Sequence, residues 1–553
     1  MNAAHRCSAA ASRRKPEAGS LSPAHGTATS TGTMAFAGMA MQGVAATRIS
    51  RPGAMPEAEL PFKPGDSALS GCSAAVASGI EPEGRAAYLD DAIPAPPFLR
   101  RPESMPPSLP PRKAKAGSIA AFARMTAKSA FALLFAVSVQ AASAQSAQDA
   151  GARAGQALLI RNATVHTAGA QGTLQGADVL VRDGVVQAVG RGLAAPAGAS
   201  VVEAGGRPLT PALFGGISEI GIEEVSGESS TDDAAVTLAQ QPMRPEFDVT
   251  MAYNPASVLV PVARVEGIGF TLLGATTGGS FIAGQGGVMR LDGGADPIGP
   301  RALFVRLGSA ASDLSGKSRA AQWMLLDQMV AEARGRVPAD SPHALLTPAG
   351  RAVLARYLAG DGRIVVSVNR ASDIHQLLRW AQRERVRIAV AGGAEAWKAA
   401  PELARAKVPV FVDALADLPA DFDQIGAGLE NAARLHAAGV AVGFAQDGDA
   451  SHNARKVRQL AGNAVSYGLP WEDGLAGLTR VPAEAFGVGD RVGTIAPGKL
   501  ADLVLWSGDP LDVAHTAEQV WLGGRAMPMR SRQTELRDRY LRDPGTLPRA
   551  YPH

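Results

Sequence analysis

The sequence predicts an α/β protein built around a parallel sheet, closed or open, together with a smaller β domain. Between residues 363 and 479, short apolar strands alternate with segments of helical apolar spacing, and short loops join them. Repeated strand–helix units of this kind are typical of parallel sheets with helices on their faces. Residues 157–206 and 489–526 both read as strands with turns, so these distant segments could form one small sheet.

The β segments are recognised by alternating apolar residues and by turn signals. Asp183-Gly184 separates two apolar runs, and Asp-Gly between such runs is a strong hairpin signal. The strands expected in the two segments are 158–165, 177–182, 185–189, 490–495, 496–506 and 517–524.

The region between them alternates strands with helices. We expect strands at 269–275, 363–368, 386–390, 408–412 and 440–444, and helices at 318–334, 373–383, 395–406, 428–438, 454–467 and 471–479. The glycine-rich stretch 281–287 lacks the Gly-Lys-Ser/Thr of a phosphate-binding loop, so we interpret it as a tight turn. Active residues in parallel α/β folds lie at the C-terminal ends of the strands.

The first 144 residues differ from the rest. Residues 1–124 contain 15 of the 38 prolines and both cysteines, Cys7 and Cys72, and we interpret them as a disordered or over-extended N-terminal segment. Residues 125–144 have a charged start, an apolar run and a small-x-small ending at Ala144, as secretory signals do. We therefore expect a periplasmic or secreted protein, cleaved near Ala144, without cysteine and with an acidic net charge in place of the +3 of the whole chain.

Composition excludes several classes of protein. Aromatic residues make up only 5% and are not interleaved with a basic stripe, which argues against a nucleic-acid surface. The longest apolar run, 130–139, is too short to span a bilayer. The expected partner is a small-molecule substrate or ligand.

Four stretches resemble the amidohydrolase superfamily, in particular imidazolonepropionase-like and dihydroorotase-like metal-dependent hydrolases. The most specific is Val492-Gly-Thr-Ile-Ala-Pro-Gly-Lys-Leu-Ala-Asp-Leu-Val504, and the others are 206–214, 439–447 and 468–487. The resemblance implies a (β/α)8 TIM barrel at 209–487 inserted in a small composite β-sandwich domain. That domain would be built from 157–208 and 488–530, with 531–553 as a C-terminal tail, and oligomers of one chain are common in the family.

The same resemblance implies a site with one or two divalent metals, usually zinc, held by four histidines and an aspartate. The family's His-x-His pair falls here on Ile217 and Glu219, and the histidine after strand 5 falls on Asn369. The histidine after strand 6 falls on Gly392 or Gly393, and Asp447 matches the aspartate after strand 8. Most of the family's metal ligands are therefore replaced, and we expect a degenerate metal site.

Two hypotheses remain open. In the first, the chain hydrolyses carbon–nitrogen bonds other than peptide bonds, with Asp447 as catalytic base and with Glu219, Asn369 and His452 around the substrate. His452 is included because it follows predicted strand 440–444 closely. In the second, the barrel has lost the metal centre and binds a small molecule or a partner protein. The sequence does not identify the substrate.

Overall fold

The structure is a computed structural model, and it describes residues 157–240, 242–446, 448 and 450–541. The predicted N-terminal extension (1–124), the signal segment (125–144) and Asp447 lie outside these described residues. Among the helices that are described, none is both long and apolar enough to cross a membrane.

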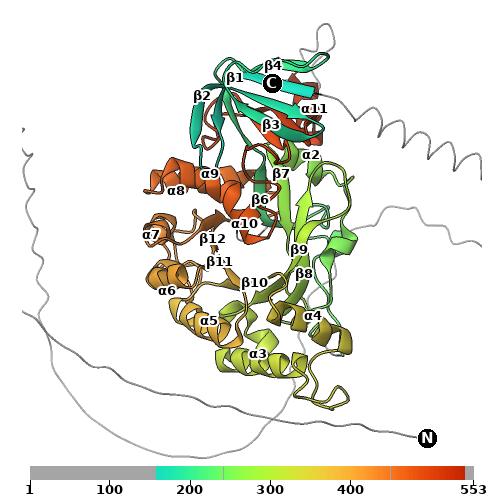
Figure 1. Cartoon of the computed structure of the whole chain (residues 1–553). Coiled ribbons are helices and arrows are strands. Elements are labelled where there is room, and N and C mark those ends of the chain that lie inside the picture. Colours follow the sequence, from blue (N-terminus) through green and yellow to red (C-terminus); the bar gives the residue numbers. More distant parts are fainter. Residues whose placement is uncertain (1–156, 241, 447, 449, 542–553) are drawn as a thin grey trace, which may run out of the picture. The chain divides into compact units, whose positions relative to one another are not determined.

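Strands from both ends of the described region pair in one eight-stranded sheet. Its order is β16-β15-β14-β5-β1-β2-β3, with β4 paired to β1. The central pairing joins β5 to β14 antiparallel, with Leu503 opposite Pro211, and Figure 1 shows the teal and red strands side by side. The strands are β1 Ala157–His166, β2 Thr173–Arg182, β3 Val185–Gly190, β4 Ser200–Glu203, β5 Pro208–Pro211, β14 Leu503–Trp506, β15 Ala517–Leu522 and β16 Arg525–Ala526. A composite sheet is therefore present, while its expected form as a sandwich stays a prediction.

The predicted Asp-Gly hairpin joins β2 to β3. Asp183 and Gly184 have φ values of 53° and 77°, and a type I′ turn needs positive φ at both central positions. The hairpin end also meets the C-terminal segment, because the Ala501 backbone N–H donates to the Gly184 carbonyl at 2.8 Å. This turn thus contributes to holding the two halves of the sheet together.

A second eight-stranded sheet forms a nearly closed barrel in a mixed α/β fold. Its order is β13-β12-β11-β10-β9-β8-β7-β6. The outer strands approach each other, since a Cβ added at Gly216 in β6 would lie 3.2 Å from the carbonyl oxygen of Phe444 in β13. The strands are β6 Leu213–Ser218, β7 Ile268–Leu273, β8 Ile282–Arg290, β9 Ile298–Arg306, β10 Arg363–Val368, β11 Ile388–Gly392, β12 Val410–Val412 and β13 Val442–Phe444.

The tight turn predicted at 281–287 is wrong, because this glycine-rich stretch is part of strand β8. β8 runs antiparallel to both β7 and β9, so the barrel departs here from strict strand–helix alternation. The glycines allow a close approach of backbones: a Cβ at Gly286 would overlap with the carbonyl oxygen of Leu273. The connections on either side of β8 are too short to hold a crossover helix, so an antiparallel pairing is the one they permit.

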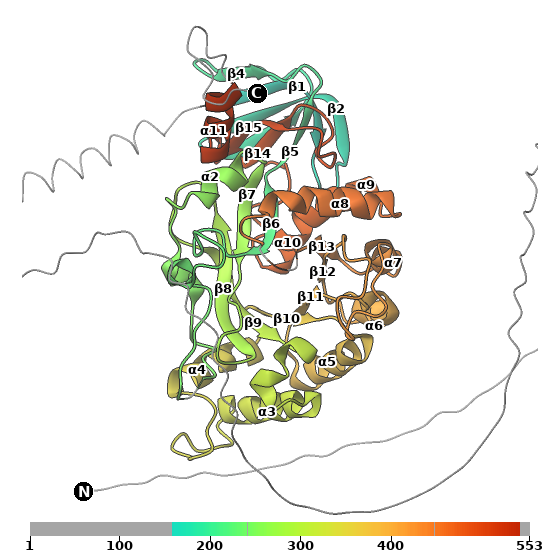
Figure 2. The ribbon, with the colours of Figure 1, turned by 180° about the vertical axis from the view of Figure 1, so that it is seen from behind.

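Helices cover the outer face of the barrel sheet (Figure 2). Leu326 of α3 and Trp380 of α5 pack with Leu303 and Val305 of β9. The predicted helices are present with shifted ends, whereas helices α2, α4, α10 and α11 and strand β9 were not predicted. The bounds are α2 Leu259–Arg264, α3 Arg319–Ala333, α4 Pro348–Leu358, α5 Ala371–Glu384, α6 Ala400–Arg405, α7 Asn431–Ala437, α8 Val457–Ser466, α9 Trp471–Leu478, α10 Arg480–Ala485 and α11 Arg532–Leu541.

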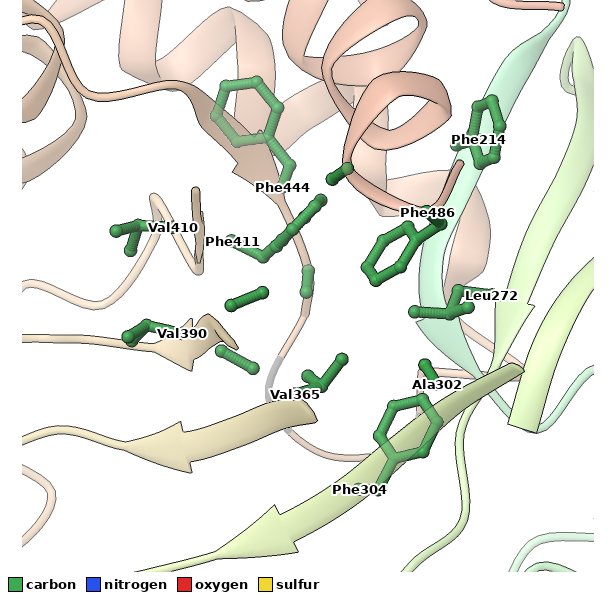
Figure 3. Packing of buried hydrophobic residues seen from close by; sticks show 14 of the residues in the cluster. Phe214, Leu272, Ala302, Phe304, Val365, Val390, Val410, Phe411, Phe444 and Phe486 are labelled. Atoms are coloured by element: carbon green, nitrogen blue, oxygen red, sulfur yellow. The ribbon is translucent and has the colours of Figure 1, made fainter. Parts of the chain in front are cut away.

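Aromatic side chains fill the interior of the barrel (Figure 3). The rings of Phe411 and Phe486 stack with centroids 5.2 Å apart, and all the labelled side chains come from one buried cluster. Phe304 belongs to this core and also lines the cavity described next, so the core forms part of the cavity floor.

Candidate functional site

A cavity of about 440 Å³ opens at the C-terminal ends of the barrel strands. Its lining comes from the ends of β6, β7, β9, β10 and β11 and from the segments after β12 and β13. This is the end of a parallel barrel at which active sites are built. The polar residues of the lining are Glu219, Glu223, Ser226, Asp232, Thr276, Thr277, Arg306, Ser367, Asn369, Asp421, Asp423 and Gln446.

Glu219 lies half-buried at the cavity, just after β6. Its backbone carbonyl accepts hydrogen bonds from the N–H groups of Ile222 (2.9 Å) and Glu223 (3.0 Å), which turn the chain at this point. Ile217, two residues earlier, packs closely on the next strand, since a Cβ at Gly274 would lie 2.7 Å from its Cγ2. The position that corresponds to the first family histidine is therefore an apolar packing residue.

Asn369 and Gly392 lie together on neighbouring strands. The Oδ1 of Asn369 accepts a hydrogen bond from the backbone N–H of Ala394 at 3.3 Å. Gly392 has a φ of 80°, and a Cβ there would lie 2.6 Å from that same Oδ1. Asn369 thus occupies the space that a side chain at position 392 would need.

The residues present do not fit the metal centre of the family. A zinc site needs three or four nitrogen, sulfur or carboxylate ligands around one point. Ile217 and Gly392 offer no such side-chain ligand, and no group of three or more His, Cys, Asp or Glu within the described ranges could hold a metal ion.

The structure brings some of the predicted site residues together and separates others. Glu219 and Asn369 line one cavity, as the sequence leads us to expect of two residues near barrel strand ends. His452 is not among the described residues that line it; its Nε2 accepts from the backbone N–H of Ser226 at 3.3 Å. Asp447 lies outside the described residues; in the sequence it stands between Gln446 and Gly448, which line the cavity.

Asp423 was not identified from the sequence, because it sits in a segment with no predicted strand or helix. It is 4% exposed and accepts hydrogen bonds at Oδ2 from the Ser309 backbone N–H (2.7 Å) and hydroxyl (2.8 Å). Arg319 of α3 forms an ion pair with Asp423 and another with Asp373 of α5. This network fastens the segment after β12 to two helices and so shapes one wall of the cavity.

The network predicts a pH-dependent stability. Burial alone would raise the pKa of Asp423, but the hydrogen bonds from Arg319 and Ser309 outweigh it and lower the pKa below the ordinary 3.8. Because the folded state favours the carboxylate, its contribution is present above that value and is lost as the pH falls through the lowered pKa. D423N is expected to cost about 1 to 3 kcal/mol in the free energy of unfolding at pH 7.

Urea unfolding from pH 7 down to pH 2 measures this effect. The difference between wild type and D423N should shrink as the pH falls below about 4. D361N serves as a control, because Asp361 forms an exposed ion pair with Arg356. A difference for D423N that stays constant over the whole range contradicts the prediction.

Arg306 and Ser367 are further lining residues that sequence reasoning missed. Ser367 lies one residue before Val368, at the C-terminal end of predicted strand 363–368. This position at a strand end could have identified Ser367 as a site residue. Arg306 is the last residue of β9, a strand that was not predicted.

Known proteins resemble this chain in its C-terminal part and in its fold. Residues 377–527 match the amidohydrolase family. An imidazolonepropionase of Aromatoleum aromaticum is 45% identical over 83 residues, which cover 15% of this chain and 20% of that protein. A 5-methylthioadenosine/S-adenosylhomocysteine deaminase of Desulforudis audaxviator is 36% identical over 120 residues, which cover 19% of this chain and 27% of that protein. The chain thus spans only about a fifth to a quarter of the length of these relatives.

A solved structure extends the likeness over a larger part of the chain. An amidohydrolase from Thermotoga maritima MSB8 superimposes with a TM-score of 0.60 at 26% sequence identity, covering 68% of this chain and 100% of that one. The family match, the relatives and this structure agree with the nearly closed barrel and with the cavity at its strand ends. The family match over residues 377–527, the relatives and this structure together support the amidohydrolase superfamily for this chain.

Proposed function

We propose that this protein hydrolyses a carbon–nitrogen bond, other than a peptide bond, in a small molecule held in the barrel cavity. The observation that carries the proposal is the position of the cavity, at the strand ends of an amidohydrolase barrel and with carboxylates in its lining. Membership of the superfamily supports the reaction class. A volume of about 440 Å³ suits a small molecule and is too small for a folded partner protein.

The proposed chemistry uses side chains of this chain alone. Glu219 lines the cavity, and Asp447 follows β13 in the sequence, so either carboxylate can serve as the general base. The base removes a proton from water, the water oxygen attacks the carbonyl carbon, the carbon–nitrogen bond breaks, and the proton passes to the leaving nitrogen. Asn369, which also lines the cavity, binds the substrate.

A second function is favoured by a specific observation. Ile217 and Gly392 stand where the family has metal-binding histidines, and Asn369 fills the space beside Gly392. A barrel so altered binds a small molecule without hydrolysing it. The two proposals share the cavity and differ in turnover.

Assays of the purified protein on lactams, cyclic imides and N-acylated amino acids separate the two. Each is run after chelation and again with added zinc or manganese. Under the hydrolase proposal, E219Q or D447N lowers turnover about 100-fold, as loss of a general base does. D340N, a change at an exposed residue outside the cavity lining, leaves turnover unchanged.

The outcomes are distinct. Binding that saturates without turnover, with or without metal, supports the binding barrel and overturns the hydrolase. If no compound of the panel is bound or hydrolysed, both proposals are overturned.

We also propose that the protein acts after export. The composition of residues 125–144 supports this, and mass spectrometry of the protein from its native cells tests it. A mature N-terminus near residue 145 is expected, and peptides from residues 20–110 contradict it.

A further inference from the structure

We propose that the cavity selects ligands that carry one carboxylate group, which binds the guanidinium of Arg306, the hydroxyl of Ser367 and the side-chain amide of Asn369. The inference deepens the proposed function, because it concerns the same cavity and names the class of molecule that enters it. It holds whether the ligand is hydrolysed or only bound.

The strand register directs Arg306 into the barrel. Leu303 and Val305 of β9 pack outward against the helices, together with Leu326 and Trp380. Successive side chains of a strand point to opposite faces, so Phe304 and Arg306 face inward. Figure 3 shows the ring of Phe304 in the barrel interior, and both residues line the cavity.

Ser367 and Asn369 belong to the neighbouring strand and its end. Ser367 pairs in register with Arg306 in the parallel β9–β10 ladder. It is on the same face of β10 as Val365, because Ile364 and Val366 pack outward against the helices. Asn369 follows two residues later, so the three polar side chains gather at one corner of the cavity.

Among the described residues, each of the three side chains has a hydrogen-bond donor that no acceptor uses. The Oδ1 of Asn369 accepts from Ala394, which leaves its NH2 group as the end available to a ligand. Within the part of the chain that the structure describes, the Arg306 guanidinium, the Ser367 hydroxyl and the Asn369 NH2 have no protein partner. By contrast, the guanidinium of Arg319 is held by two carboxylates, those of Asp373 and Asp423.

A corner lined by donors of this kind suits an anion. The planar guanidinium matches a carboxylate with two parallel hydrogen bonds, and a hydroxyl and an amide add further donors. The rest of the lining also carries carboxylates, which repel a second negative charge; they are Glu219, Glu223, Asp232 and Asp421, together with Asp423, which is paired with Arg319. The complementary ligand therefore has one carboxylate, and the rest of it is neutral or cationic.

Matched pairs of probes test this selection. Calorimetric titration of the full protein compares N-acetylalanine with N-acetylalaninamide, and pyroglutamate with pyroglutamamide. Each pair differs only in carboxylate against carboxamide. The carboxylate is expected to bind about 10- to 100-fold more tightly, the value of hydrogen bonds to a charged group.

Variants test whether the preference for a carboxylate over a carboxamide arises from Arg306 and Asn369. R306M should remove it, and R306K should keep part of it. N369D is the sharpest change, because aspartate still accepts from Ala394 but replaces the NH2 donor with a negative charge, which should reverse the preference. R405M is the control, since Arg405 is exposed at the end of α6 and outside the cavity lining.

Several results overturn the inference. They are equal affinity within both pairs, no binding of either carboxylate at millimolar concentration, or a preference that persists in R306M and N369D. If R306M does not fold, R306K and N369D decide alone. If the carboxylates bind but are not hydrolysed, the inference stands and the hydrolase proposal is overturned. If carboxamides are hydrolysed as fast as carboxylates and R306K does not change this, the hydrolase proposal stands and the inference is overturned.

Discussion

Replacing Gly392 with histidine is expected to destabilise the protein by about 2 to 6 kcal/mol and to create no zinc site. The φ of 80° at Gly392 costs a residue with a Cβ about 1 to 3 kcal/mol. The new side chain also displaces Asn369, and the N–H of Ala394 then loses its acceptor, at a further cost of about 1 to 3 kcal/mol. The imidazole gains no second histidine ligand, because Ile217 and Asn369 stand at histidine positions of the family.

Urea unfolding and elemental analysis measure the two parts of this prediction. G198H is the matched control, because Gly198 has a φ of 76° and nothing within 4 Å of an added Cβ, so it reports the backbone cost alone. In an N369A background the cost of G392H should fall to that of G198H. A stable G392H protein that takes up one zinc per chain contradicts the prediction.

Removing the side chain of Trp506 is expected to cost about 3 to 5 kcal/mol, the range for a buried tryptophan. Trp506 is fully buried at the end of β14, and its Nε1 donates to the Thr210 hydroxyl at 2.9 Å. The Arg458 guanidinium lies 4.6 Å from its ring centroid. Gly267, which precedes β7, lies so close that a Cβ there would overlap with the ring. One side chain thus joins the composite sheet to the barrel.

Two further variants give this measurement its scale. W506F keeps an aromatic ring and loses the N–H, and should cost about 1 to 2 kcal/mol, since Thr210 also donates to the Pro211 carbonyl. M324A, at a side chain that is 61% exposed, should change the free energy of unfolding by less than about 0.5 kcal/mol. If W506A costs no more than M324A, the joining role is wrong.

Much of the fold could be predicted because its signals are local. Alternation and helical spacing identified β10, α5, β11 and α3, and Asp183-Gly184 identified a hairpin whose positive φ angles the structure contains. The turn predicted at 281–287 was wrong, because glycines needed for a close approach of backbones look the same in the sequence as glycines needed for a turn. Only the neighbouring strand, with the Leu273 carbonyl against Gly286, distinguishes the two.

The site was less accessible from the sequence. Glu219 and Asn369 were found because they fall at family ligand positions, and both line the cavity. Arg306 and Asp423 became visible only with the chain folded, since each depends on contacts or strand register between segments far apart in sequence. His452 was proposed from its nearness in sequence to β13, but its hydrogen bond is to the backbone of Ser226.

The pairing of β5 with β14 has a consequence for how the protein folds. About three hundred residues separate these partners, so strand β5 (208–211) has no β14 to pair with until residues 503–506 have emerged from the ribosome. Long-range pairings of this kind slow folding and leave apolar edges open to aggregation meanwhile. During synthesis the first half of the composite sheet therefore has an unprotected strand edge, which is a binding target for chaperones until β14, near the C-terminal end of the described chain, has been made.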